Sequence, residues 1–319
     1  MSANPPGPVE RAIAEHPRLR RNQSAIVGVS GGRDSAVLLR ALVKAGYHHL
    51  IVCHLDHQLR PESQEDALFV GQLAHDLGQV SELGVENVRQ FAKSRKLSIE
   101  AGAREARYAF FAEIARAHWC PRIILAHHAD DQVETFLLNL LRGSGATGLG
   151  GMRPITAREV HGGLLEIHRP LLSVWREEIT EYADHHHVKF HEDASNLDRK
   201  YMRNRIRHDV LPALSTTLER DVRRALWRSA EILSAENDYL SSQTPPPNDP
   251  ELSVADLRTL PLAIRRRLIY AWLRAREVAD VGFEDVEAVE RMLETTRSAK
   301  VNVAGGKHVR RRAGRLFVE

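Results

Sequence analysis

The most informative part of the chain is AIVGVSGGRDSAVLLRALVKAG, residues 25–46. Its first five residues form a short apolar run, which predicts a buried strand, and residues 36–46 have the apolar spacing of a helix. The string SGGRDS lies between the two. Glycines let a backbone approach a ligand closely, and the first N–H groups of a helix attract anions. The stretch therefore predicts a strand, an anion-binding loop and a helix.

The composition of this loop indicates a phosphate site that also involves a metal. Ser30 and Ser35 add hydroxyl donors. Asp34 would repel phosphate unless it held a Mg²⁺ ion that bridges to it. The alternative is a plain turn in which Asp34 and Ser35 cap the helix. The sequence has no GxxxxGK[ST] motif, and the GxGxxG at 143–148 follows a predicted helix instead of a strand, so it does not fit a dinucleotide fingerprint.

Strand-like and helix-like segments alternate on both sides of this stretch. Further strands are expected at 50–56, 79–85, 122–126 and 164–168, and helices at 62–78, 86–96, 101–118, 130–142 and 174–187. This alternation predicts an α/β fold, with a doubly wound, mostly parallel sheet and helices on both faces. After about residue 190 the pattern becomes helical and basic. A turn cluster at 243–250, two helices at 261–276 and 282–295, and a small β-containing end follow.

Charge and composition narrow the class of protein. Of the 319 residues, 43% are hydrophobic, which is ordinary for a globular protein and excludes disorder. Residues 199–228 hold nine Arg or Lys and three acids, and such a basic patch favours a polyanionic partner. Cys53 and Cys120 are the only cysteines, which excludes a disulfide scaffold. No membrane span and no secretory signal are expected, so we expect a cytoplasmic protein.

SGGRDS at the first strand–helix turn resembles the PP-loop ATP pyrophosphatase superfamily, whose fold is adenine-nucleotide alpha-hydrolase-like. Four further segments sharpen the resemblance: HLDHQLR (54–60), AREARYAFF (103–111), HHADDQVETFLLNLLRGSGATGLGGM (127–152) and RNRIRHDVLPAL (203–214). In this order and spacing they are similar to the short form of the tRNA(Ile)-lysidine synthetase family.

The resemblance implies a two-step reaction on RNA. ATP adenylates the wobble cytidine of the CAU-anticodon isoleucine tRNA and releases pyrophosphate. Free L-lysine then displaces AMP and leaves lysidine. ATP and Mg²⁺ are the implied co-substrate and ion, and tRNA(Ile) and lysine are the implied partners. A homodimer is a further expectation.

The same resemblance implies roles for individual residues. The ATP-binding set is Ser30, Gly31, Gly32, Arg33, Asp34 and Ser35, with Asp34 also holding Mg²⁺. Arg107 would stabilise the leaving pyrophosphate, with Arg104 as the second choice. His127 would act in the adenylation state. Asp131 and Glu134 share one helix face and would bind lysine, Glu134 also taking the proton of the amine. We expect Asp130 to cap the helix instead.

Contacts with tRNA are expected from basic residues: Arg142, Arg203, Arg205, Arg207, Arg310, Arg311 and Arg312. The glycines at 143–151 would let the loop move. The expected organisation is an N-terminal extension (1–20), a PP-loop catalytic domain (21–195), a basic helical linker that contacts tRNA (196–242) and a small tRNA-recognition domain (243–319).

Three other interpretations of the function stay open. The string CHLDH at 53–57 nearly matches the HxHxDH signature of dinuclear zinc hydrolases, but Val52 replaces the first His. A PP-loop enzyme that transfers sulfur to tRNA would need a cysteine pair, and Cys53 and Cys120 are far apart in the sequence. A tRNA-binding protein without catalysis would explain the basic segments but not the loop.

Overall fold

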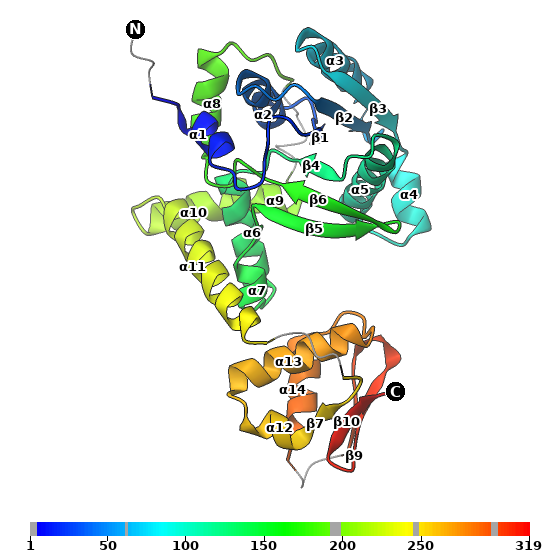
Figure 1. Ribbon diagram of the computed structural model, residues 1–319. Helices are drawn as coiled ribbons and strands as arrows, with labels where there is room; N and C mark the ends of the chain where they lie inside the picture. The colour runs from blue at the N-terminus through cyan, green and yellow to red at the C-terminus, as the bar shows by residue number, and fades with distance from the viewer. Residues whose placement is uncertain (1–4, 61–62, 192–198, 245–248, 295–298) are drawn as a thin grey trace. The chain divides into compact units, whose positions relative to one another are not determined.

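The computed structural model describes residues 5–60, 63–191, 199–244, 249–294 and 299–319. Parts of three predicted segments, the helices 62–78 and 282–295 and the turn cluster 243–250, lie outside these residues. The chain divides into two compact units, Met1–Glu231 and Ile232–Glu319 (Figure 1).

The first unit is built on a six-stranded sheet with the order β3-β2-β1-β4-β6-β5. Its strands are β1 (Ala25–Gly28), β2 (Leu50–Asp56), β3 (Val80–Val85), β4 (Arg122–Ile124), β5 (Ile155–Val160) and β6 (Gly163–His168). The first four strands and β6 pair in parallel, whereas β5 pairs with β6 in the antiparallel direction. The predicted mostly parallel sheet is confirmed.

Twelve helical segments accompany this sheet among the described residues. They are α1 (Pro8–Ala14), α2 (Arg33–Lys44), α3 (Ser63–Asp76), α4 (Val88–Ser94), α5 (Ile99–Ala117), α6 (Ala129–Leu141), α7 (Ala146–Leu149), α8 (Arg176–His185), α9 (Met202–Arg205), the π-helical turn η2 (Ile206–Val210), α10 (Leu211–Thr217) and α11 (Arg223–Ser242).

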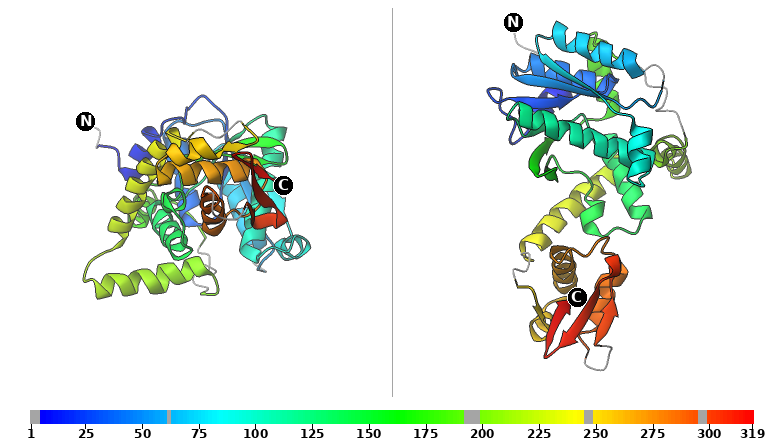
Figure 2. Two further views of the ribbon diagram at one scale, coloured as in Figure 1. Left: turned by 90° about the horizontal axis from the view of Figure 1, so that it is seen from below. Right: turned by 90° about the vertical axis from the view of Figure 1, so that its right-hand side faces the viewer.

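Alternate residues of the strands belong to two different cores, one on each face of the sheet. Val27 and Val52 pack with α1, α2 and α8, whereas Ile26 and Ile51 pack with α5. Successive side chains of a strand point to opposite faces, so a strand buried on both faces reads as a continuous apolar run. Helices therefore cover both faces, as Figures 1 and 2 show.

Two parts of the first unit differ from the sequence expectations. The strand β5 was not predicted, because its sequence ITAREV mixes polar and apolar residues as an edge strand does. The segment 1–20, expected to be an extension, contains α1. Val9 and Ile13 of this helix are 1% exposed and belong to the same core as β1, so α1 is an integral part of the unit.

After α11, the described residues of the second unit form three α-helices and a small antiparallel sheet, β7-β10-β9-β8. Its elements are β7 (Leu252–Ser253), α12 (Val254–Thr259), α13 (Leu262–Ala275), α14 (Phe283–Arg291), β8 (Lys300–Asn302), the 3₁₀ turn η3 (Ala304–Gly306), β9 (His308–Arg312) and β10 (Arg315–Val318). The fully buried Trp272 of α13 lies in its core, and its indole N–H donates to the carbonyl of Pro250. The predicted helices and the β-containing end are confirmed.

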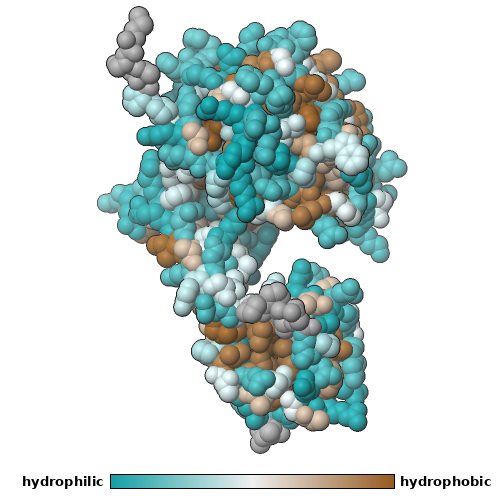
Figure 3. Space-filling view, viewed as in Figure 1, coloured by the Kyte–Doolittle hydropathy of each residue, from teal (hydrophilic) through white to brown (hydrophobic). Residues whose placement is uncertain are grey.

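The surfaces of the two units differ in hydropathy (Figure 3). The visible face of the first unit is mostly hydrophilic, whereas apolar residues gather on the visible face of the second. Among the exposed apolar side chains of the second unit are Leu262, Tyr270 and Phe283. Among the described residues, no helix has the length and apolar character that crossing a membrane requires.

Candidate active site

The residues predicted to bind ATP and lysine follow the ends of two strands of the first unit. SGGRDS follows β1 and HHADDQVE follows β4, and these two strands are neighbours in the sheet. The chain turns from β1 to β2 and β3 on one side and to β4 and β6 on the other. Open α/β sheets bind ligands at such a switch point, outside the carboxyl ends of the strands.

The SGGRDS loop is held by its own serines. The hydroxyl of Ser35 accepts from the backbone N–H of Ser30 at 3.1 Å and donates to the carbonyl of Gly32 at 2.9 Å. Gly31 has φ +91°, a left-handed conformation that favours glycine. The loop therefore brings Ser30, Gly32 and Ser35 together at the start of α2. Nη1 of Arg33 instead donates to Oγ1 of Thr180 in α8 at 2.6 Å. The guanidinium of Arg33 is therefore bonded to α8, and Arg33 contributes its backbone to the loop.

One imidazole joins this loop to the acidic start of α6. Nε2 of His128 lies 3.4 Å from Oδ2 of Asp34 and 3.5 Å from Oδ2 of Asp131. His128 is 1% exposed. Burial alone would lower its pKa, but Asp131, Asp130 and Asp34 raise the pKa of His128 to about 10. The protonated ring in turn lowers the pKa of Asp34 against the effect of burial, together with Arg176.

The structure gives the helix-capping contact at the start of α6 to Asp131 and not to Asp130. Asp131, expected only to bind substrate, caps α6, because its Oδ2 accepts from the N–H of His128 at 3.0 Å. Asp130, expected to be the cap, accepts from the N–H of Arg176 at 3.0 Å and from Nη1 of Arg223 at 2.9 Å. Asp130 therefore ties α6 to α8 and α11. The prediction that Asp130 is the helix cap is wrong.

The predicted lysine-binding carboxylates are paired with an arginine from much later in the chain. Nε of Arg207 donates to Oε1 of Glu134 at 2.5 Å, and its Nη2 lies 3.5 Å from Oδ1 of Asp131. Nε of Arg203 lies 3.5 Å from the other oxygen of Glu134. Glu134 is fully buried. Burial and Asp131 raise the pKa of Glu134, and the two guanidinium groups oppose this rise.

His127 and Arg107 lie at the same edge but in different surroundings. Burial lowers the pKa of His127 to about 3, so its ring is neutral at pH 7. Arg107, on α5, is exposed, and its Nη2 lies 3.4 Å from Nε2 of His57, just after β2. Burial and this arginine lower the pKa of His57 to about 4. Arg107 thus faces the end of β2, with a neutral histidine beside it.

The arginines expected to contact tRNA fall into two groups. Arg142, Arg205, Arg310 and Arg312 are exposed. Arg203 and Arg207 instead contact α6, and Arg311 donates to the carbonyls of Met292 and Glu294. The glycine-rich segment expected to move contains α7, and its C-terminal end is held by Gln132, which bonds to Gly150 and Met152.

Sequence reasoning missed His128 as a site residue, although the pair of histidines before two aspartates was the available signal. It also missed Arg176, whose Nη2 lies 3.9 Å from Asp34. Cys53 and Cys120 are 1% and 2% exposed, and burial raises the pKa of both thiols. Within the described ranges, no three His, Cys, Asp or Glu side chains could hold a metal ion together, and this includes CHLDH.

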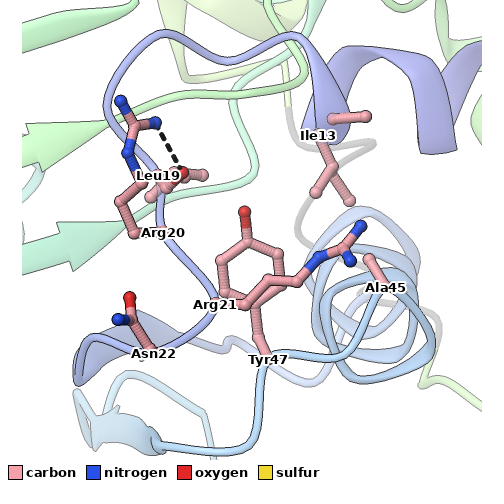
Figure 4. Close-up of a pocket in the computed structure, with 8 residues that line it drawn as sticks. Ile13, Leu19, Arg20, Arg21, Asn22, Ala45 and Tyr47 are labelled. Carbon is pink, nitrogen blue, oxygen red and sulfur yellow. Dashed lines mark hydrogen bonds between the residues drawn. The ribbon is translucent and has the colours of Figure 1, made fainter.

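A separate pocket lies near the N-terminal ends of β1 and β2 (Figure 4). It has a volume of about 400 Å³ and is lined by Ile13, Leu19, Arg20, Arg21, Asn22 and Tyr47, among others. Arg20 donates to the carbonyl of Leu19. None of the predicted site residues lines this pocket.

Comparison with solved structures supports the fold. A U34-tRNA thiolase from Methanococcus maripaludis superposes with a TM-score of 0.53 at 15% identity, over 71% of this chain and 78% of its own. At that identity the likeness concerns the fold alone.

Sequence comparison identifies the family. Residues 7–214 match the PP-loop domain, and residues 252–317 match the TilS substrate binding domain. A tRNA(Ile)-lysidine synthase from Geobacter sulfurreducens is 37% identical over 88% of this chain, which spans 61% of that relative's length. One from Gloeobacter violaceus is 36% identical over 83% of this chain and 81% of its own. The chain spans about three fifths of the first of these relatives and most of the second. With both of its units matched, the chain belongs to the tRNA(Ile)-lysidine synthase family.

Proposed function

We propose that this chain joins free L-lysine to C2 of the wobble cytidine of CAU-anticodon tRNA(Ile), at the expense of ATP. The observation that carries the proposal is the position of His128. One ring nitrogen of this residue reaches both Asp34 of the SGGRDS loop and Asp131 of the acidic pair. A site that activates a base with ATP and then delivers an amine needs these two parts side by side.

In the first step, the cytidine O2 attacks the α-phosphorus of ATP, and pyrophosphate leaves. The backbone N–H groups and the hydroxyls of Ser30 and Ser35 would cradle the phosphates at the start of α2. Arg107 would stabilise the charge on the pyrophosphate. His127, neutral and buried, would lie against the adenylated base.

A Mg²⁺ ion fits the loop by the chemistry of its donors. Magnesium in nucleotide sites is often held by one or two carboxylates plus the phosphates of the substrate. Asp34 supplies such a carboxylate, and its side chain is 30% exposed at the sheet edge. When bound, the ion would neutralise charge on the phosphates.

In the second step, the ε-amine of lysine attacks C2, and AMP leaves with the former O2 oxygen. Asp131 and Glu134 would hold the two amino groups of lysine. The attacking nitrogen must lose a proton, and Glu134 would accept it, because burial and Asp131 raise the pKa of this carboxylate and so make it a stronger base. Sulfur transfer is a weaker alternative, because both cysteines are buried.

The proposal also assigns a function to each segment of the chain. Residues 21–195 would bind ATP and lysine. Residues 196–242 would contact tRNA, and residues 243–319, which include the region matching the TilS substrate binding domain, would recognise it. Exposed Arg142 and Arg205 lie in the first unit, where they would meet phosphates near the anticodon.

The decisive experiment supplies purified protein with Mg²⁺, ATP, labelled lysine and unmodified tRNA(Ile) that carries the CAU anticodon. We expect label in the tRNA with one AMP formed per lysine. AMP and pyrophosphate release without label would point to another nucleophile. No ATP turnover with any tRNA would leave a binding protein on a PP-loop fold and overturn the proposal.

A further inference from the structure

Three arginines that the sequence places in one basic segment do not share one environment. Arg203 and Arg207 are four residues apart and both reach α6, whereas Arg205 lies between them and is exposed. The side chain of Arg207 is 18% exposed, and that of Glu134 is 1% exposed. A guanidinium that is mostly covered and bonded to a buried carboxylate is badly placed to contact the phosphates of an RNA.

The carboxylate oxygens of the acidic pair are unequally occupied. Oδ2 of Asp131 accepts from the backbone of His128, and Oε1 of Glu134 accepts from Arg207. Oε2 of Glu134 is buried and has no hydrogen bond among the described residues, although Nε of Arg203 lies 3.5 Å from it as an ion-pair partner. Nδ1 of His127 is likewise buried without a hydrogen bond among these residues. Buried polar atoms are nearly always hydrogen-bonded, so an orphaned oxygen at a sheet switch point marks the place of a ligand.

The planar guanidinium of Arg207 spans both acidic residues. Its Nε bonds to Glu134 at 2.5 Å, and its Nη2 lies 3.5 Å from Asp131. A rigid fork that reaches two carboxylates fixes the separation and rotation of both. A cation is also needed here, because a fully buried carboxylate without a partner carries a large desolvation cost.

We propose that Arg207 is a positioning residue of the amine-substrate site: it holds Oε1 of Glu134, so that Oε2, which Arg203 approaches without a hydrogen bond, can receive an ammonium group, while Arg205 faces the RNA. The inference rests on the proposed function and refines it. Arg207 is thereby removed from the set of tRNA-contacting residues expected from the sequence.

The test compares Arg207→Lys and Arg207→Gln with the matched control Arg205→Gln. Pyrophosphate release is measured with ATP and tRNA in the absence of lysine, and the KM values for lysine and for tRNA are measured in the full reaction. We expect both Arg207 variants to release pyrophosphate within threefold of the wild-type rate. Their KM for lysine should rise at least tenfold with the KM for tRNA unchanged, Arg207→Lys being affected less. Arg205→Gln should show the opposite split, with only the KM for tRNA raised.

Two results would overturn the inference. A raised KM for tRNA with an unchanged KM for lysine in Arg207→Gln would return this residue to the RNA surface. Loss of pyrophosphate release in both Arg207 variants would make its role a structural one. Failure of the proposed function is seen separately, because the wild-type protein itself would then release pyrophosphate without incorporating lysine, or would release none.

Discussion

At the scale of single residues, the site is organised by charges that compensate one another under burial. His128 is surrounded by Asp34, Asp130 and Asp131, and Glu134 is paired with Arg207 and Arg203. Each charged group offsets the free-energy cost of burying its oppositely charged partner, since an unpaired buried charge is strongly destabilising. The sequence predicts that Asp131 and Glu134 share a helix face. It cannot predict that Arg207, 73 positions later, closes the pair, because nothing local encodes that contact.

Glu134→Gln should separate the two steps of the proposed reaction. The amide keeps the size of the side chain but cannot accept the proton of the attacking amine. We expect pyrophosphate release with ATP and tRNA to continue, and the rate of lysine incorporation at saturating lysine to fall by about 100-fold or more, in line with the loss of a general base. Rapid-quench measurement of adenylated and lysidine-containing tRNA checks this. Normal lysidine formation by the variant would exclude Glu134 as the base.

At the scale of elements, the loop between β1 and α2 places one glycine under a strict conformational demand. Gly31 has φ +91°, whereas Gly32 has φ −74° and ψ 164°, an extended conformation open to any residue. A Cβ atom on Gly32 would meet only the hydroxyl of Ser30, at 3.5 Å. The pattern SGGRDS predicts the loop but not which of its two glycines carries the strain.

Gly31→Ala should therefore lower the free energy of unfolding by about 1–3 kcal/mol, the usual cost of an L side chain in an unfavourable backbone region. Gly32→Ala, the matched control, should change it by well under 1 kcal/mol. Urea unfolding followed by circular dichroism compares the two. Equal destabilisation by both substitutions would contradict the conformations assigned to the loop.

Two buried histidines, His16 just after α1 and His168 at the end of β6, form a second titratable pair. The rings of His16 and His168 lie 5.2 Å apart, and both residues are buried. Burial lowers the pKa of both, that of His168 to about 4. Because these folded-state pKa values lie below the unfolded value of about 6.5, the unfolded chain binds more protons in acid. The stabilisation is complete above pH 6.5 and is lost as the pH falls towards 4.

His168→Gln should remove part of this acid sensitivity. In the wild-type protein, His168 alone can account for a loss of up to about 3 kcal/mol between pH 6.5 and 4. The variant should show a shallower dependence of the free energy of unfolding on pH in that window. Urea titrations at several pH values measure it, and an unchanged slope would show that His168 is not a buried neutral group.

For the whole molecule, most of the architecture can be predicted from the sequence. The strands and helices of the first unit follow from apolar runs and their period, because this sheet is buried on both faces. The edge strand β5 was not predicted, because a half-exposed edge strand has a mixture of polar and apolar residues. The helix α1 was not predicted, because its two buried residues, Val9 and Ile13, lie in a short Pro-rich segment. Which arginines face solvent depends on tertiary packing, and charge patterning alone does not reveal it.

The three consecutive arginines of β9 give a prediction for the second unit. Arg310 and Arg312 are exposed, whereas Arg311 donates to the carbonyls of Met292 and Glu294 at the end of α14. Replacing Arg310 and Arg312 with Glu should weaken tRNA binding and reduce the slope of log K against log salt by about one for each lost phosphate contact. Arg311→Ala should instead lower stability by about 1–2 kcal/mol and leave the salt slope unchanged. Titrations at several salt concentrations, with thermal melts, distinguish the two.

The contact between Glu134 and Arg207 also has a consequence for biosynthesis. The carboxylate leaves the ribosome 73 residues before the guanidinium that neutralises it. At the usual 5–20 residues per second, the nascent chain waits roughly 4 to 15 seconds with its acidic helix start uncompensated. During that interval α6 can be assembled, but the final arrangement of the acidic pair cannot. A nascent chain stalled before residue 207 should therefore hold the strands of the sheet without a finished site for its amine substrate.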